Sequence, residues 1–153
     1  MALMNCKNTP NMVFLFKKYG EYMTDMQIMY GFREIAVNHL ERTPEFWSVI
    51  LPMVKQQLNG LDRNTPKALC TAISSAAAMR LSDNEFWETV EQKLVDEGLH
   101  RYLTLEQHAE LVNNLARVGR GSDDLIETIE KTFIKHRKGL TPNTQDMATR
   151  GFN

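Results

Sequence analysis

The apolar positions of the chain recur at spacings of three and four residues, which is the pattern of amphipathic helices. An alternation with a period of two, which would indicate strands, does not emerge anywhere along the chain. The pattern therefore predicts an all-α protein. We expect helices over residues 12–19, 25–41, 44–58, 66–80, 83–97, 105–118 and 123–137, and a short helix from residue 142.

Capping residues mark the expected helix boundaries. A threonine followed by proline places a hydroxyl at the N-cap and proline at the first helical position, where its missing N–H costs nothing. Such pairs are Thr43-Pro44, Thr65-Pro66 and Thr141-Pro142. Capping-box spacing occurs in Ser82 with Glu85 and in Thr104 with Gln107. Glycines suited to a left-handed helix end are Gly98, Gly119 and Gly139.

Two landmarks recur at intervals of about 40 residues. Glu45-Phe46-Trp47 returns as Glu85-Phe86-Trp87, and the segment from Ser82 returns, with one residue deleted, from Ser122. Helical hairpins of this period stack into an α-solenoid, because each hairpin buries one face against its neighbours. We therefore predict one domain over residues 1–153, with units at about 12–42, 43–81 and 82–121 and an incomplete unit at 122–153.

The second helix of each unit begins near Thr24, Thr65 and Thr104, which are 41 and 39 residues apart. Counting from these threonines gives the same inward face in each unit. Offset four gives Ile28, Leu69 and His108. Offset eight gives Phe32, Ile73 and Val112, and offset eleven gives Ile35, Ala76 and Leu115. An alanine at offset twelve is expected to let neighbouring helices approach closely, in Ala36, Ala77 and Ala116. The aromatic first helices are expected to fill the outer layer through Phe46, Trp47, Phe86 and Trp87.

Part of the chain resembles the octotricopeptide-type helical repeats, which are related to those of FAST-kinase-like and RAP-domain organellar proteins. The resembling residues are Glu85-Phe86-Trp87, Leu94, Leu103-Thr104-Leu105-Glu106-Gln107 and the segment from Leu111 to Gly119. Residues 44–81 are similar to a more divergent copy, so the resemblance covers roughly residues 44–138. It implies an organellar protein, either an RNA-binding factor or an accessory subunit of a large mitochondrial assembly.

Composition describes an ordinary globular domain, with 42% hydrophobic and 24% charged residues. The net charge of the chain is −1. A dedicated nucleic-acid binder usually carries a basic domain or stripe that neutralises phosphates, and the overall charge does not indicate one here. Two distant cysteines, Cys6 and Cys70, indicate a reducing compartment and neither a disulfide framework nor a zinc site.

Candidate chemistry is scarce. The four histidines share no ligand spacing with the cysteines or with carboxylates, so we expect no metal and no cofactor. His108 is expected to fill the core with one hydrogen-bonded nitrogen. Gly119-Arg120-Gly121 lacks the strand and the lysine of a phosphate loop and is better explained as a helix end and a turn. No nucleophile motif is recognisable, and we expect no enzymatic activity.

The second helices also carry the expected partner-binding surface, at offsets six, nine and thirteen. This row reads Tyr30, Arg33 and Val37; Thr71, Ser74 and Ala78; then Glu110, Asn113 and Arg117, with Asn114 beside it. One aromatic, two arginines and an opposing glutamate suit protein contacts at least as well as RNA, which needs stacking aromatics and cations. Our interpretation is an accessory or scaffold subunit that contacts other protein subunits, and the alternative is an organellar RNA-binding protein.

Two interpretations remain open for each of several features near the ends of the chain. A basic cluster closes the last long helix, where it either complements the helix dipole or docks an acidic or RNA surface. It comprises Lys131, Lys135, His136, Arg137 and Lys138. Lysines without acids in the first twenty residues favour a plain N-terminal helix over an import signal. The methionines Met12, Met23, Met26 and Met29 are assigned to the core more readily than to docking.

No membrane span is expected, because the apolar run from Met12 to Phe16 is too short. The resemblance implies a mitochondrial location, and without it a cytoplasmic one would be expected.

Overall fold

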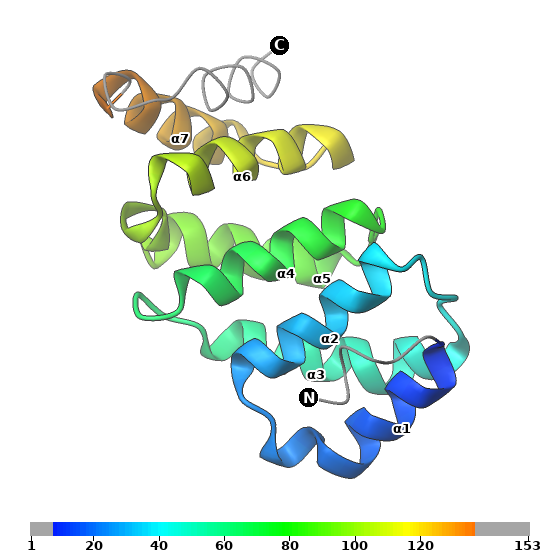
Figure 1. The fold of residues 1–153 in the computed structure, drawn as a ribbon. Helices are drawn as coiled ribbons and strands as arrows, with labels where there is room; N and C mark the ends of the chain where they lie inside the picture. The colour runs from blue at the N-terminus through cyan, green and yellow to red at the C-terminus, as the bar shows by residue number, and fades with distance from the viewer. Residues whose placement is uncertain (1–7, 137–153) are drawn as a thin grey trace.

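The computed structural model describes residues 8–136, with side chains to residue 131, as a stack of helices (Figure 1). This range contains no strand, which confirms the all-α class for the part described. The long helices are α1 (Thr9–Tyr19), α2 (Asp25–Val37), α3 (Leu51–Gly60), α4 (Pro66–Ala78), α5 (Asn84–Glu91), α6 (Leu105–Val118) and α7 (Asp123–His136). Short helical turns are η2 (Gly20–Tyr22), η3 (Phe46–Ile50), η4 (Gln92–Asp96) and η5 (Leu99–Tyr102).

The helices are arranged in two layers. In one layer α2, α4 and α6 lie side by side, so that α4 contacts both of its neighbours (Figure 1). In the other layer α1 contacts η3, α3 contacts α5, and η4 contacts α7. Contacts of α2 with α3, of α3 with α4 and of α6 with α7 join the layers. From α1 to α5, each helix, or the helical turn continuous with it, therefore packs against the helix or turn two places further along the chain.

The core lies between these layers and contains the predicted inward face. All residues expected at offsets four, eight and eleven are buried, His108 included, as are Ala36 and Ala77. Ala116 is exposed, contrary to the prediction. A further helix of the same layer follows α2 and α4, whereas no described helix follows α6 there.

Aromatic rings connect α2 with η3 and α5. The Phe32 ring lies with its centroid 6.4 Å from Phe46 and 6.2 Å from Phe86, and all three rings are fully buried. The Trp87 indole is also buried, and its N–H donates to the Leu81 carbonyl at 2.7 Å. Trp47 was expected in the same layer, but its side chain packs edge-on against Phe46 and stays 44% exposed. Its indole lacks a bond like that of Trp87 among the described residues.

The helices of the α2–α4–α6 layer end in the same way. A residue with left-handed backbone follows each of them: His39 and Arg80 with φ of 52°, and Gly119 with φ of 66°. The next residue then donates its N–H back into the helix, from Leu40 to Ile35, from Leu81 to Ala76 and from Arg120 to Leu115. This arrangement satisfies carbonyls that a helix end would otherwise leave unpaired. Gly119 was predicted, whereas His39 and Arg80 were not, because neither position carries a glycine.

Helix starts were predicted in part. The Thr104–Gln107 capping box is confirmed, and Thr24 with Gln27 forms a second one. In α5 the cap is Asp83 rather than Ser82, because the Asp83 carboxylate accepts the Phe86 N–H at 2.8 Å. At Pro66 the helix begins as expected, but the Thr65 hydroxyl donates to the Asp62 carbonyl and does not cap. Thr141-Pro142, Gly139 and the expected helix from residue 142 lie outside the described residues.

Proline explains the wide turn that precedes α3. Pro52 lies inside a continuous helical segment, where its ring would collide with the carbonyl four residues earlier and its missing N–H breaks the bonding ladder. The backbone widens to a π-helical turn over η3 just before it, with the Leu51 N–H donating to the Phe46 carbonyl. The sequence predicted one regular helix here, and the extra residue per turn was not visible in the apolar pattern.

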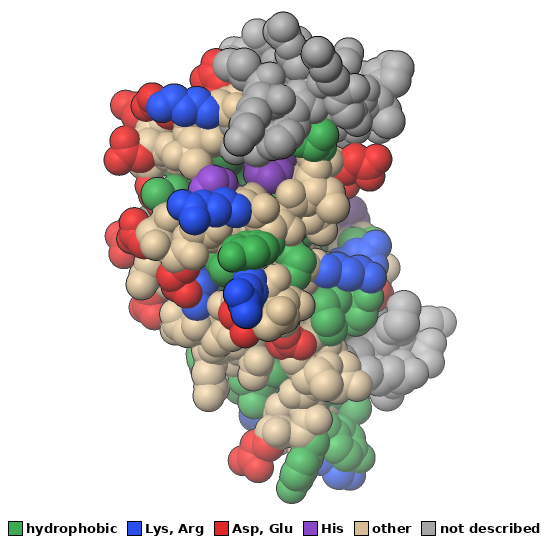
Figure 2. All heavy atoms as spheres, turned by 90° about the vertical axis from the view of Figure 1, so that its left-hand side faces the viewer, with side chains coloured by type: hydrophobic (Ala, Val, Ile, Leu, Met, Phe, Trp, Pro, Cys, Tyr) green, Lys and Arg blue, Asp and Glu red, His purple; other side chains and the backbone are tan. Residues whose placement is uncertain are grey.

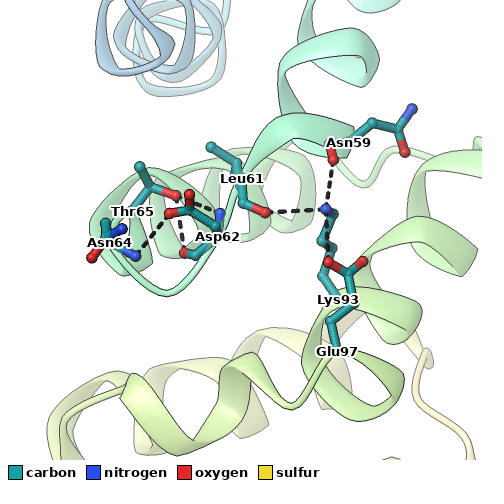
Figure 3. A network of polar contacts seen from close by, with 7 residues as sticks. All are labelled: Asn59, Leu61, Asp62, Asn64, Thr65, Lys93 and Glu97. Atoms are coloured by element: carbon teal, nitrogen blue, oxygen red, sulfur yellow. Dashed lines mark hydrogen bonds and ion pairs between the residues drawn. The ribbon is translucent and has the colours of Figure 1, made fainter.

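A buried lysine joins the end of α3 to η4 (Figure 3). The Lys93 ammonium, only 6% exposed as a residue, donates to the carbonyls of Asn59 at 2.5 Å and Leu61 at 3.0 Å. Its third bond goes to the Glu97 carboxylate at 3.1 Å. Positive charge is favourable at a helix C-terminus, where unpaired carbonyls gather. Lys93 thus caps the C-terminal end of α3 from η4.

Candidate partner-binding surface

The predicted row lies on α2, α4 and α6, and the adjacency of these helices brings its members onto one face. Arg33, Glu110 and Arg117 are exposed, and the smaller or uncharged members Tyr30, Thr71, Ser74 and Asn113 are half-buried. Val37 is 55% exposed, and Ala78 at the same offset is exposed as well. The row therefore exists as a surface, with large side chains on α2 and α6 and small ones on α4 between them.

Two hydroxyls of the row are already used within their own helix. The Thr71 hydroxyl donates to the Lys67 carbonyl at 2.8 Å, and the Ser74 hydroxyl donates to the Thr71 carbonyl at 3.2 Å. Serine and threonine in helix interiors commonly bond to the preceding turn in this way. Because these hydroxyl protons are already donated within the helix, the α4 portion of the row is a small, largely apolar surface.

Asn114 departs from its neighbours in the row, since it is a buried polar residue at 8% exposure. It lines a small cleft between α4 and α6, with a cavity volume of about 10 Å³. The other lining residues are Cys70, Ile73, Gln107, Glu110 and Leu111. The sequence predicted Asn114 for the surface but did not reveal the cleft. Its two walls come from separate helices that are distant in sequence: Cys70 and Gln107, for example, are 37 residues apart.

Glu110 is the one acidic residue among those that line the cleft. Burial raises the pKa of the Cys70 thiol to about 12, and the Glu110 carboxylate adds to the rise. The thiol is therefore protonated at neutral pH, and a nucleophilic or metal-binding thiolate is not available here. The cleft thus offers an apolar base with one carboxylate at its rim.

A second surface lies at the α1–η2 end of the molecule and was not predicted. Its aromatic side chains are Phe14, Tyr19 and Tyr22, which are 58%, 44% and 81% exposed. The Lys18 ammonium lies 5.5 Å from the Phe14 ring centroid and 5.3 Å from that of Tyr19, within cation–π range. We call these four residues the aromatic–lysine patch. Figure 2 shows hydrophobic side chains gathered with basic ones at this lower end.

The methionines of the first two helices belong mainly to the core. Met12 and Met29 are fully buried, and Met23 and Met26 are half-buried against the core cluster. This outcome confirms the core assignment for Met12 and Met29. The exposed apolar surface at this end comes instead from the aromatic residues of α1 and η2.

Only Lys131 of the predicted basic cluster has a described side chain. It is exposed and pairs with the Glu127 carboxylate of the preceding turn at 2.9 Å. The hydrogen bond to Glu127 and its charge raise the pKa of Lys131. The Lys135 side chain, and Arg137 and Lys138 as a whole, lie outside the described residues.

The residues singled out for possible chemistry have structural partners. The His108 Nδ1 atom bonds to the Thr104 carbonyl at 2.9 Å, as expected for a core histidine. Gly119 ends α6 in the left-handed conformation, and the Arg120 guanidinium donates to the Asn84 side chain at 2.8 Å. In residues 8–136, no group of three metal-ligating side chains stands close enough to share an ion.

Within the same range, no helix combines the length and apolar character that crossing a membrane requires. Neither the known protein-family models nor the curated proteins contain a match to this chain.

Proposed function

We propose that the chain is a non-catalytic α-solenoid that serves as an accessory or scaffold subunit of a large mitochondrial assembly, such as an ATP synthase, a respiratory complex or a mitoribosome. The observation that carries the proposal is the continuous face of α2, α4 and α6, whose exposed charges are mixed and few. In solenoid proteins a row of adjacent helices of this kind forms the binding surface. The mitochondrial location follows from the resemblance to organellar helical repeats.

The repeat is supported by the helix ends. The left-handed residues His39, Arg80 and Gly119 are 41 and 39 residues apart, the same intervals that separate Thr24, Thr65 and Thr104. The starts and the ends of α2, α4 and α6 thus recur at the same two intervals along the sequence, in one register. A stack of similar hairpins produces such a register, and we infer a period of about 40 residues.

Protein contact is supported by the character of the row. An RNA-binding row requires cations along its length to neutralise phosphates. Here Arg33 and Arg117 lie on the outer two helices, Glu110 opposes them, and α4 contributes only small side chains. Mixed, mostly neutral surface with apolar portions is typical of protein interfaces.

RNA binding is the alternative, and the aromatic–lysine patch is the observation that favours it. Exposed aromatic rings beside cations stack nucleobases and contact the backbone in single-stranded RNA binders. Phe14, Tyr19, Tyr22 and Lys18 supply both groups on one short segment. The same patch also suits a protein partner, since exposed apolar clusters mark interfaces.

Native purification of the tagged chain, with and without ribonuclease, decides between the two proposals. The scaffold proposal expects a stoichiometric set of mitochondrial subunits that resists ribonuclease. Identification of the proteins by mass spectrometry names the assembly. Recovery of RNA, or loss of all partners after ribonuclease, contradicts the scaffold proposal.

A binding assay with single-stranded oligouridylate completes the comparison. The RNA alternative expects affinity that falls steeply with added salt. It also expects a clear loss of affinity when Phe14→Ala and Lys18→Glu are combined. Absence of salt-dependent affinity contradicts the alternative.

A further inference from the structure

The aromatic–lysine patch exposes an unusual amount of ring surface on one short segment of α1 and η2. A complete aromatic side chain offers 150–250 Å², so the exposed parts of Phe14, Tyr19 and Tyr22 present on the order of 350 Å². The largest apolar patch on a typical monomer has about this size and is often functional. The patch is therefore a candidate docking surface.

The bend between α1 and η2 fixes how the patch is displayed. Gly20 is buried between Tyr19 and Tyr22 in the sequence, and a Cβ atom added to it would collide with the side chain of Met53 on α3. The backbone of η2 thus packs directly on α3, and the Met23 N–H closes the turn by donating to the Gly20 carbonyl at 3.2 Å. A surface that is ordered in advance loses less conformational entropy on binding.

The patch also carries positive charge that the described chain does not pair. Described lysines that form ion pairs with acids are Lys55, Lys93 and Lys131. Lys17 and Lys18 of α1 are exposed and form no ion pair within the described residues. The Phe14 and Tyr19 rings hold the Lys18 ammonium in place at 5.5 and 5.3 Å but do not neutralise its charge.

This charge is too small for a polyanion. Two lysines and the one acid of the segment, Glu21, leave residues 9–22 with a net charge of +1. Phosphate backbones and anionic membranes attract surfaces that carry several cations. The Lys18 ammonium also lies over two of the rings on which nucleobases would have to stack. One or two carboxylates on a protein match the charge better.

A second copy of the chain fits poorly. If two patches faced each other, the contact would bring the lysines of both copies together, which is unfavourable. It would also bury only about 700 Å², whereas stable protein interfaces bury at least roughly 1,200 Å². A different protein can bring opposite charge and extend the contact beyond the patch.

We propose that the aromatic–lysine patch binds a segment of a partner protein in which one or two carboxylates lie beside apolar side chains. The carboxylates pair with the ammonium groups of Lys17 and Lys18, and the apolar side chains cover the aromatic rings. Exclusion of water by the apolar contacts strengthens the charge pairs. The inference rests on the proposed function and names the chemistry of the segment that the partner supplies.

The test begins with random dodecapeptides displayed on phage. They are depleted on the Phe14→Ala, Lys18→Glu double variant and then selected on the full-length wild-type chain. Peptides with aspartate or glutamate beside leucine or aromatic residues should be enriched. A fluorescent synthetic copy of the most enriched peptide is titrated with the protein and followed by anisotropy. Single-stranded oligouridylate and phosphatidylserine vesicles are tested in parallel as the competing classes of ligand.

Lys18→Glu should weaken binding of this peptide about tenfold or more, because repulsion replaces attraction. Tyr22→Ser should weaken it about tenfold through the loss of an aromatic anchor. Lys67→Glu is the matched control and should bind like the wild type. It reverses the charge of an exposed lysine that also forms no ion pair within the described residues, on α4 in the other layer.

A charge swap separates binding from folding. Lysine in the last turn of a helix complements the helix dipole, so Lys18→Glu should also lower the urea midpoint slightly. A peptide whose acid is replaced by lysine should nevertheless bind Lys18→Glu more tightly than it binds the wild type. Equal binding of this peptide to both proteins would show that no charge pair forms at Lys18 and would overturn the proposal.

Two further outcomes also overturn the proposal. One is a failure to enrich any acidic peptide whose binding depends on the patch. The other is a loss of oligouridylate or vesicle binding in Lys18→Glu without a loss of peptide binding. If mitochondrial subunits copurify with the double variant at wild-type yield, the inference fails and the proposed function stands. If the peptide requires the patch but no subunits copurify with the wild type, only the proposed function fails.

Discussion

At the scale of single residues, Lys93 illustrates how the chain buries a charged group. Lys93 uses all three ammonium protons, on the carbonyls of Asn59 and Leu61 and on Glu97. Lys93 thereby stabilises the junction between α3 and η4. A buried charge is tolerated only with such complete pairing.

Lys93→Met tests the structural role of this ammonium. The methionine keeps the length of the side chain but leaves two buried carbonyls without a donor, so we expect the free energy of unfolding to fall by about 3 kcal/mol. Urea unfolding followed by circular dichroism measures the change. Lys131→Met is the control, because the exposed pair of Lys131 with Glu127 should leave the urea midpoint unchanged. Equal midpoints for Lys93→Met and wild type would contradict the role assigned to Lys93.

His100 makes the stability of the chain depend on pH. Burial lowers the pKa of His100, and the charges of His108 and Arg101 lower it further. Above the ordinary histidine pKa of about 6.5 the side chain is neutral in both states. Below it the unfolded chain binds a proton that the folded chain resists, so the free energy of unfolding falls as the pH drops through this range.

The variant His100→Gln isolates this contribution from that of the other titrating groups. We expect its unfolding free energy to fall less than that of the wild type when urea unfolding is measured at pH values above and below 6.5. The same loss in both proteins would show that His100 does not contribute to the pH dependence.

At the scale of elements, the helix ends set where each hairpin turns. Three helices of one layer end on a left-handed residue, but only the third of these residues is glycine. A side chain in this conformation costs about 1 kcal/mol relative to glycine, because its Cβ crowds the backbone. The bonds from Leu40 and Leu81 back into their helices hold His39 and Arg80 there despite this cost.

Arg80→Gly should therefore stabilise the protein by about 1 kcal/mol, and Gly119→Ala should destabilise it by a similar amount. The Arg80 side chain is exposed, so its loss should not remove core packing. Urea midpoints of the two variants give opposite shifts if the assignment of the helix ends is right. A destabilised Arg80→Gly would show that the arginine side chain makes a contribution larger than the backbone strain.

At the scale of the whole molecule, α4 is the central helix. It packs between α2 and α6, and buried residues occupy most of its length, whereas α1 and α7 stand at the two ends of their layer (Figure 1). In a stack with contacts mainly between neighbours, the ends open at lower free energy than the centre.

Native-state hydrogen exchange should accordingly be slowest at the amides of α4 and faster in α1 and α7. Exchange followed by mass spectrometry of peptic fragments resolves the three helices. Slowest exchange in α1 or α7 would mean that stability is not organised around the central helix.

Much of this architecture could be predicted from the sequence. Apolar spacing located the described helices, because one buried stripe is enough to specify a helix. Capping predicted Thr104 and Gly119 correctly, since these signals are local. It placed the α5 cap one residue early, because Ser82 and Asp83 both suit the position and only the structure shows which one accepts the bond. The left-handed His39 and Arg80 carry no glycine and so gave no signal.

The candidate site was less predictable for a physical reason. The row on α2, α4 and α6 followed from helical spacing, but the cleft depends on how closely α4 and α6 approach each other. Asn114 looks like any polar surface residue until its burial is known. The aromatic–lysine patch was missed because Phe14 belongs to an apolar run, in which the buried and exposed members differ only by helix rotation.

The bonds of Lys93 also affect its chemical reactivity. An ammonium that donates three bonds inside the protein cannot be acylated by an amine-directed reagent until the α3–η4 junction opens. The exposed lysines of α1 react at once under the same conditions. Pulsed acetylation with mass-spectrometric detection at Lys93 would thus count opening events of this junction in the intact protein, without any engineered label.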